Sequence, residues 1–463
     1  MPNFIDGSIT NSSMNAGLVS AIQDRTLQRT FRDALFPRLL YRLEAVGEMW
    51  PVNLGANQTF TRAGLIQPRT RPLVQNQEPT PVAYQIEQWE ATAQQWGDPI
   101  DTHMPTSYVS LASQYLRNMH QLGCHAGQSL NRVVRDKLYN CYVAGNTVVI
   151  AAGYAGGGTA LPVQNLAGFT KKLFSGRPTI VSASNPLPIT IYLAGGTITR
   201  NVIGFTSDYA GDEIHSGTLT LDVAIVAATC TGREAVIASN ASQVIYSGGG
   251  LRVDDVGASD QFRMADIRAA VAQLQFNNVP THEDGTYHFH LDPISQSQIF
   301  GDNEFQRLNQ SMPDYIHYRK MAIAFLLGCT FYRNSEAPTV ATINEDPVKG
   351  FTTAFETTNP TGVTLHRPIV TGQGAIEEKY LDESRYISEA GVMGKIGEFA
   401  VVNSGMQIMT ERVRLILRSP LDRLQQTTSA AWSMSGDWPI PTDATALSSA
   451  AVYKRSVCVI HGA

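Results

Sequence analysis

The sequence predicts an α+β fold that carries a small inserted β-sandwich or barrel domain, and three observations support this prediction. Apolar residues recur at helical spacing over residues 107–143, with no proline among them. Short β-branched runs lie between two glycine clusters, at 153–158 and 247–250. Helical and strand patterns then alternate along the rest of the chain. At 463 residues the chain is too long for one compact core, so two or three domains are expected.

The N-terminal part predicts a polar tail of about 20 residues followed by a helix over residues 22–48. Pro37 is expected to kink or divide this helix because proline lacks the backbone donor. One face of the helix carries three cations. They could meet DNA, a scaffold or acidic neighbours, or they could form a solvated stripe with Asp24 and Asp33. These cations are Arg25, Arg29 and Arg32.

Residues 50–105 are rich in glutamine, threonine, proline and aromatic residues, and they predict a strand from Phe60 followed by a long hairpin with a proline-broken tip. An isolated hairpin is marginal in water because it cannot bury its own faces. We therefore expect the hairpin to lie on another subunit. Contact with another subunit is also the hypothesis for the three arginines of the N-terminal helix, with the solvated stripe as its alternative. The hairpin residues expected at such a contact are Arg69, Arg71, Tyr84, Ile86, Trp89 and Trp96.

The apolar stripe over residues 107–143 predicts a helix of about 55 Å at 1.5 Å per residue. Gly123 and Gly127 should weaken it locally. Because the spacing does not keep a strict heptad, a long helix under a sheet is favoured over a coiled coil.

The region 146–250 predicts short strands at 179–181, 189–193, 219–226 and 235–239, separated by turn signals. Glycine hinges at both ends are typical of a domain inserted into a host fold.

Beyond residue 250 the patterns predict a helix over 264–280, the strand GTYHFHLDP, a further helix and a strand from Cys329 to Arg333. Two C-terminal strands, VRLILRSP and YKRSVCVIHGA, flank the polar aromatic stretch WSMSGDWPIPTDAT.

Charge and composition exclude several classes of protein. A net charge of −5 disfavours tight nucleic-acid binding, which requires a cationic face. The polar N-terminal run predicts no signal peptide, and no apolar run is long enough to span a membrane. Five cysteines lie far apart without a CxxC spacing, so buried reduced thiols are expected in place of disulfides or a zinc site.

No catalytic, cofactor or metal site is predicted. His288 and His290 share one strand face near His282 and Asp284, but ordinary strand histidines are favoured over metal ligands there. The glycine clusters lack the features of a phosphate loop, and no nucleophile motif is present. The paired carboxylates Glu377–Glu378 are expected on a solvated surface.

The block GTYHFHLDPISQSQIFGDNEFQRLNQSM, with the segment IHYRKMAIAFLLGCTFYRNSEAP after it, is similar to a coat-protein pattern of tailed bacteriophages. VRDKLYNCYVAGN, LRVDDVGASDQFRMADIRAAVAQLQFNNVP and VRLILRSPLDRLQQTTSAAW resemble further segments of the same group. The resemblance covers about three-quarters of the chain and leaves out residues 146–250. It implies a major capsid protein of the HK97-like fold, with no enzymatic activity and no cofactor.

The family's parts map onto the chain in order. The resemblance implies an N-terminal arm (1–60), an E-loop hairpin (61–105), a spine helix of the P-domain (106–145) and the inserted β-rich domain (146–250). An A-domain with part of the P-domain (251–400) and the return strands of the P-domain (401–463) follow.

The family also implies partners and a location. They are a homo-oligomer of pentamers and hexamers in an icosahedral shell, with portal, scaffolding and cement or decoration proteins, around weakly and non-specifically contacted double-stranded DNA, and no membrane. The protein would assemble in the host bacterial cytoplasm and reside in the virion.

One departure from the family concerns covalent crosslinking. Some shells of this fold join an E-loop lysine to a neighbouring asparagine, whereas no lysine precedes Lys137 here. Stability is therefore expected from buried area and strand pairing between subunits. The alternatives are a β-rich surface adhesin or, third, an enzyme on an α+β scaffold.

Overall fold

The structure is a computed structural model. It describes residues 28–35, 40–50, 55–63, 86–109, 114–150, 158–174, 177–193, 196–208, 216–226, 234–309, 325–337, 363–381, 395–396, 399–402, 405–410, 412–418, 423–424, 426–441 and 455–463, with scattered positions between 69 and 81.

The chain divides into two compact units, which are described separately. The first comprises residues 1–58, 91–134 and 378–438, and the second comprises residues 59–90, 135–377 and 439–463. Helices and strands occur in both, which confirms the predicted α+β class.

The first unit contains an eight-stranded sheet in the order β1-β19-β24-β23-β22-β21-β20, with β4 also pairing with β24. The predicted strand VRLILRSP is confirmed as β23, in which alternate residues are buried. No strand was predicted in the polar aromatic stretch WSMSGDWPIPTDAT, but its first half belongs to β24. The strands are β1 (Ala45–Met49), β4 (Gln94–His103), β19 (Ile376–Tyr380), β20 (Lys395–Ile396), β21 (Phe399–Val402), β22 (Gly405–Thr410), β23 (Val413–Arg418) and β24 (Thr427–Asp437).

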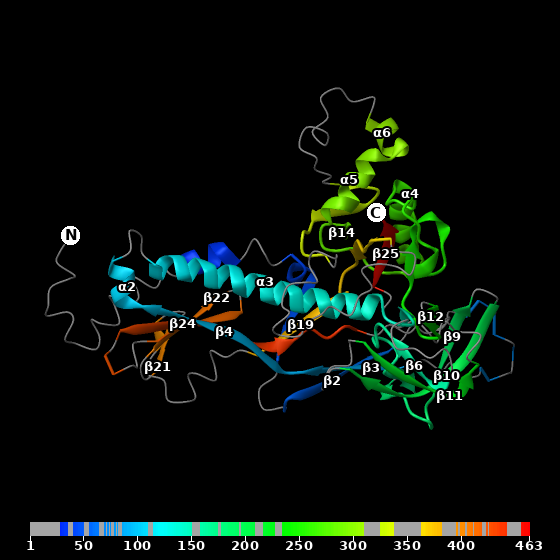
Figure 1. Ribbon diagram of the computed structural model, residues 1–463, viewed down its shortest axis with the longest axis horizontal. Helices are drawn as coiled ribbons and strands as arrows, with labels where there is room; N and C mark the ends of the chain where they lie inside the picture. Colours follow the sequence, from blue (N-terminus) through cyan, green and yellow to red (C-terminus); the bar gives the residue numbers. More distant parts are fainter. Residues whose placement is uncertain are drawn as a thin grey trace. The chain divides into compact units, whose positions relative to one another are not determined.

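The predicted long helix is present as α3 (Gln114–Tyr142), preceded by the short α2 (Met104–Val109). At 29 residues α3 is about 44 Å long, shorter than expected from the sequence pattern. Its first part runs alongside β4 and β24 (Figure 1). The predicted apolar stripe is buried at Met119, Leu122, Ala126, Leu130, Val134 and Leu138.

Gly123 has a packing role that the sequence pattern did not indicate. A Cβ atom at this position would lie 2.5 Å from the backbone oxygen of Phe31. Phe31 belongs to the helical segment 28–35, whose apolar face is buried. The glycine therefore lets this segment approach the backbone of α3.

The second unit contains a six-stranded sheet in the order β5-β12-β9-β10-β11-β6. A bridge between Val149 and Val163 joins its two ends, so the sheet closes into a small barrel. The four strands predicted in this region correspond to β8, β9, β11 and β12, whereas β5, β6, β7 and β10 were not predicted. That the barrel is an inserted domain remains a prediction. Its strands are β5 (Asn146–Val148), β6 (Gly158–Val163), β9 (Leu187–Leu193), β10 (Gly196–Ser207), β11 (Gly217–Ile225) and β12 (Ala235–Ala238), and the hairpin β7 (Lys171–Phe174) and β8 (Arg177–Ile180) lies between β6 and β9 in sequence.

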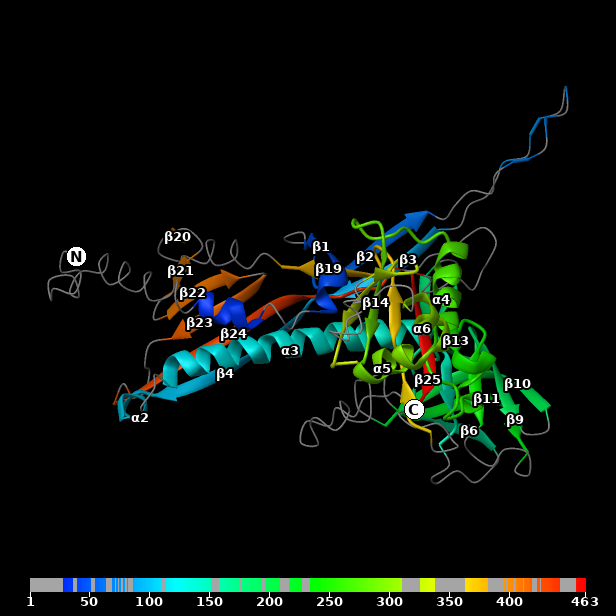
Figure 2. The ribbon, with the colours of Figure 1, turned by 90° about the horizontal axis from the view of Figure 1, so that it is seen from above.

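A seven-stranded sheet in the order β13-β25-β18-β14-β16-β15, with β17 pairing with β25, forms the rest of this unit. The helices α4 and α5 pack beside it around one apolar core (Figure 2). The elements are β13 (Val244–Tyr246), β14 (Tyr287–Leu291), β15 (Phe325–Leu326), β16 (Cys329–Arg333), β17 (Leu365–His366), β18 (Ile369–Thr371), β25 (Ser456–Gly462), α4 (Met264–Phe276), α5 (Pro293–Gly301) and α6 (Asn303–Asn309), with the 3₁₀ turns η2 (Arg42–Glu44), η3 (Ser247–Gly249) and η4 (Val253–Asp255) elsewhere in the chain.

The predicted strand at Phe60 belongs to β2 (Asn57–Ala63), which forms a two-stranded ribbon with β3 (Ile86–Thr92); the two strands pair only with each other among the described strands. Most of the run between them, where the hairpin tip was predicted, lies outside the described residues. None of the described helices combines the length and apolar character needed to cross a bilayer.

Candidate functional site

The two-stranded ribbon is held by a small contact of its own. The rings of Phe60 and Trp89 stack with centroids 5.8 Å apart, and Gln88 donates a hydrogen bond to Thr61. This contact buries Trp89 within its own chain, whereas Ile86 is 46% exposed. Of these two residues, Ile86 is therefore the one with an exposed side chain, and contact of either with another subunit remains a prediction.

The other hairpin residues singled out from the sequence lie apart from this contact. Arg69 is exposed, and Leu73, four residues further along the segment that connects β2 and β3, is 63% exposed. Trp96 lies on β4, where its ring contacts Trp438 at 6.3 Å, and β4 pairs with β24 along its whole length. Arg71 and Tyr84 lie outside the described residues.

The N-terminal arginines fall on the exposed face of the segment 28–35. Arg29 forms an ion pair with Asp33 at 3.8 Å, with both side chains largely exposed. This pair is the arrangement expected of a solvated stripe, and contact of Arg29 and Arg32 with another subunit remains a prediction. Arg25 lies outside the described residues.

A buried ion pair ties the N-terminal segment to the sheet of the first unit. Arg42 donates to both carboxylate oxygens of Glu378, and Arg412 approaches the same carboxylate at 3.2 Å. Arg412 also lies over the ring of Tyr380 at 4.6 Å. The expectation of a solvated Glu377–Glu378 pair is wrong for Glu378, which is buried and pairs with two arginines.

The strand histidines are arranged as the sequence predicted, with Phe289 in the core on the opposite face. The rings of His282 and His288 stack at 3.8 Å, and His288 Nε2 lies 3.1 Å from Asp284 Oδ2. Burial raises the pKa of Asp284, but hydrogen bonds from Thr286 and His288 outweigh it and lower this pKa to about 2. His290 is buried and stacks on Tyr332.

Of the cysteines, Cys329 and Cys458 are buried free thiols, and burial raises the pKa of each to about 12. Both are therefore uncharged at physiological pH and pack as small apolar side chains. This is the state that the sequence predicted for them.

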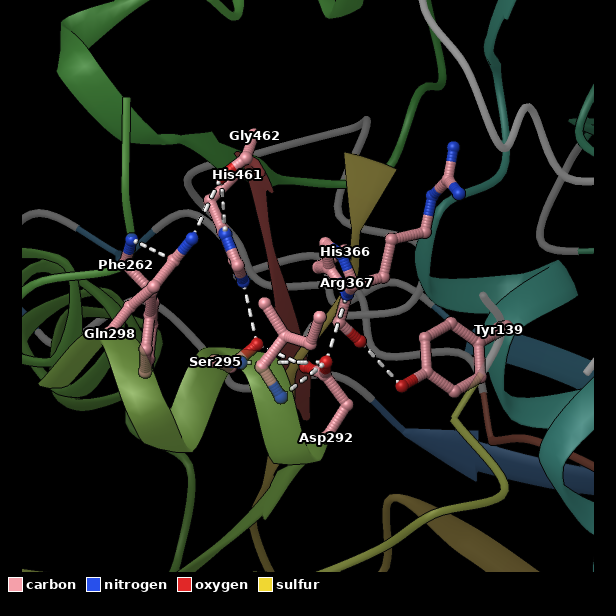
Figure 3. A network of polar contacts seen from close by, with 10 residues as sticks. Tyr139, Phe262, Asp292, Ser295, Gln298, His366, Arg367, His461 and Gly462 are labelled. Atoms are coloured by element: carbon pink, nitrogen blue, oxygen red, sulfur yellow. Dashed lines mark hydrogen bonds and ion pairs between the residues drawn. The ribbon is translucent and has the colours of Figure 1, made fainter. Parts of the chain in front are cut away.

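A buried polar network joins the start of α5 to strands β17 and β25 (Figure 3). Asp292 caps α5 by accepting from the backbone N–H groups of Ile294 and Ser295. Its carboxylate also contacts the Ser295 hydroxyl, and His366 Nδ1 lies 2.8 Å from Asp292 Oδ2. Ser295 Oγ lies 2.6 Å from His461 Nε2.

The surroundings of this network are apolar or paired. His461 stacks on Phe262 at 5.4 Å, and its Nδ1 lies 3.2 Å from the Gly462 carbonyl. That carbonyl also accepts from Gln298. Beside His366, the carbonyl of the buried Arg367 accepts from Tyr139 at 2.6 Å.

Two ionisable groups of the network, His461 and Asp292, have shifted pKa values of different origin. Burial lowers the pKa of His461 to about 4, against the opposing influence of the Asp292 charge and the Gly462 carbonyl. Burial raises the pKa of Asp292, but hydrogen bonds from His366 and Ser295 outweigh it, so this pKa lies below its ordinary value. The network therefore holds a carboxylate and a neutral imidazole at neutral pH.

Serine, histidine and aspartate are also the residue types of a hydrolase triad, but this arrangement differs from one. In a triad the imidazole bridges the hydroxyl and the carboxylate. Here the Ser295 hydroxyl bridges His461 and Asp292, and all three side chains are buried. The geometry positions the serine as a structural link and not as a nucleophile.

Comparison with known proteins finds no matching family model and no matching curated protein. Among solved structures, the chain is similar to the capsid of Ralstonia phage GP4, with 9% identity over 91% of this chain and 87% of that one, at a TM-score of 0.46. The cyanophage Pam1 capsid gives 9% identity over 91% and 89%, at 0.49. The mature capsid of bacteriophage PhiM1 gives 7% identity over 90% and 86%, at 0.43.

Proposed function

We propose that this chain is the major capsid protein of a tailed bacteriophage and acts as a structural subunit without enzymatic activity. The order of its elements supports this proposal. A helical N-terminal segment, a two-stranded ribbon, a long helix and a C-terminal strand in a mixed sheet follow one another as the sequence resemblance implies.

The ribbon β2–β3 is the observation that carries the proposal. Two-stranded ribbons are marginally stable alone, and this one has no third strand among the described residues. Its outer surface keeps the apolar side chain of Ile86 exposed. A second copy of the chain would cover this surface and supply the missing apolar contacts.

The proposed assembly is an icosahedral head of pentamers and hexamers around double-stranded DNA. A net charge of −5 suits a wall that encloses DNA with weak, non-specific contacts. Portal, scaffolding and cement or decoration proteins are the proposed partners. The proposed sites are the host bacterial cytoplasm for assembly and the virion for the finished shell.

The domain boundaries inferred from the sequence are part of this proposal. The arm would span residues 1–60, the E-loop 61–105 and the spine helix 106–145, with the inserted domain at 146–250. Residues 251–400 would form the A-domain and part of the P-domain, and 401–463 the return strands.

Negative-stain microscopy of the full-length protein, expressed in a bacterium, tests the proposal. Shells, tubes or capsomers are the expected products, because repeated weak contacts between copies add up in a closed lattice. A protein that stays monomeric under all assembly conditions, with and without a co-expressed scaffold, would overturn the proposal.

The role of the ribbon is tested by Ile86→Glu, with Val226→Glu as the matched control. Both are exposed aliphatic residues, but Val226 follows β11 in the barrel. We expect Ile86→Glu to abolish closed shells while the monomer keeps its circular dichroism spectrum. Normal shells from Ile86→Glu would contradict the proposed contact.

A further inference from the structure

The contacts around Ser295 require more hydrogens than the neutral side chains supply. Three contacts run in series: Asp292 to the Ser295 hydroxyl, Ser295 Oγ to His461 Nε2, and His461 Nδ1 to the Gly462 carbonyl. Each needs one hydrogen to be attractive. A serine hydroxyl and a neutral imidazole provide one each, so two hydrogens serve three contacts.

Two arrangements are open to the neutral network, and each leaves one contact without a hydrogen. If Ser295 donates to Asp292 and His461 carries its hydrogen on Nε2, the bare Nδ1 faces the Gly462 carbonyl. If His461 carries its hydrogen on Nδ1, Ser295 must donate to Nε2, and its oxygen then faces the carboxylate of Asp292 without a hydrogen.

The first arrangement is favoured for two reasons. A hydrogen bond to the charged carboxylate is stronger than one to a neutral imidazole nitrogen. The Gly462 carbonyl also has a second donor in Gln298, at 3.1 Å, so it keeps a hydrogen bond when Nδ1 is bare. At neutral pH the hydrogen of His461 is therefore expected on Nε2.

We propose that His461 is a proton-binding switch in β25, which takes up a proton at Nδ1 on acidification and so completes a continuous hydrogen-bond chain from Gly462 to Asp292. The new N–H donates to the Gly462 carbonyl, Nε2–H donates to Ser295 and the Ser295 hydroxyl stays on Asp292. The imidazolium then forms a buried pair with the Asp292 carboxylate through the serine.

The charged and titratable groups around His461 come from three elements. Asp292 at the start of α5 attracts the added positive charge, and His366 on β17 faces the imidazole ring with centroids 5.3 Å apart. The Gly462 carbonyl lies on β25 itself, and the ring of Phe262 covers the remaining face. All of these positions are buried.

The switch also has a predicted sign for stability. The unfolded imidazole titrates near pH 6.5, and burial lowers the folded pKa to about 4. The unfolded chain therefore binds the proton first, and stability falls as the pH drops from 6.5 to 4. Between pH 6.5 and pH 4 the unfolding equilibrium constant should rise roughly 80-fold through this one group.

The tautomer is tested with protein carrying ¹⁵N-labelled histidine, in which the His461 signals are identified by their loss in His461→Gln. We expect an Nε2–H tautomer at neutral pH and a second protonation at Nδ1 only near pH 4. An Nδ1–H tautomer at neutral pH, or an imidazolium there, would overturn the proposal.

Two variants separate the switch from a merely structural histidine. Ser295→Ala should abolish the preference for Nε2–H, because the hydroxyl acceptor is gone; an unchanged tautomer would count against the chain. The slope of the urea-unfolding free energy between pH 4 and 6.5 should fall by up to one proton in His461→Gln but stay unchanged in the control His103→Gln, which lies outside this network on β4. An unchanged slope in His461→Gln would refute the switch, and neither outcome depends on whether the protein forms shells.

Discussion

The barrel and the ribbon of the second unit are both built from antiparallel strands, but they satisfy their surfaces in opposite ways. The barrel closes on itself through the Val149–Val163 bridge and fills its interior with buried side chains. The ribbon has two strands, one aromatic contact and an exposed aliphatic surface. A closed sheet has no unpaired strand edge, whereas an open pair of strands keeps backbone and apolar groups that another chain can contact.

The largest expected effect comes from breaking the barrel core. Phe169 is buried in this core, so Phe169→Ala should lower the free energy of unfolding by about 3–5 kcal/mol. Urea unfolding followed by circular dichroism measures it. A loss below about 1 kcal/mol would show that the barrel is not a packed core.

In contrast to the barrel and the ribbon, the first unit contains a buried ion pair between Arg42 and Glu378. Glu378→Gln leaves Arg42 buried opposite a neutral group and should cost about 3 kcal/mol in the same measurement. The double variant Arg42→Met/Glu378→Met should regain part of this loss. A double variant worse than the single one would contradict the pairing.

Within the ribbon, the aromatic contact should matter locally. Trp89→Ala should lower the global free energy of unfolding by only about 1 kcal/mol, because the Phe60–Trp89 stack stabilises the ribbon alone. Hydrogen exchange should show lost protection in β2 and β3 alone. Loss of protection in the barrel as well would mean that ribbon and barrel unfold together.

The smallest effect is expected at the exposed aliphatic residue. Ile86→Ser should lower the free energy of unfolding of the monomer by less than about 0.5 kcal/mol, because the residue is already 46% exposed. A thermal unfolding scan of the unassembled protein measures it. A larger loss would show that the surface of Ile86 is covered within the monomer.

The sequence predicted elements whose signal is local. The sequence predicted α3, β16 and α4 correctly. In each of them the apolar residues recur with the period of the helix or strand and form its buried face. Strand β24 was missed because the small residues around the buried Ala430, Trp432 and Met434 obscure their alternation. It is a strand because β23 and β4 pair with it from both sides.

The buried polar groups were beyond prediction because their partners are distant in sequence. The sequence around Glu378 is typical of a solvated surface, and its partner Arg42 lies 336 positions away along the chain. His461 and Ser295 are likewise 166 positions apart. No spacing rule links such residues, so the network of Figure 3 becomes visible only in three dimensions.

The position of β25 in its sheet has a consequence for the folding pathway. This strand pairs with β13, β17 and β18, yet it follows all of them along the chain. Val244 cannot pair with Cys458, its partner in the ladder, until Cys458 has been synthesised. Such non-local pairing is slow, so the nascent chain should expose the unpaired edges of this sheet until β25 has been synthesised.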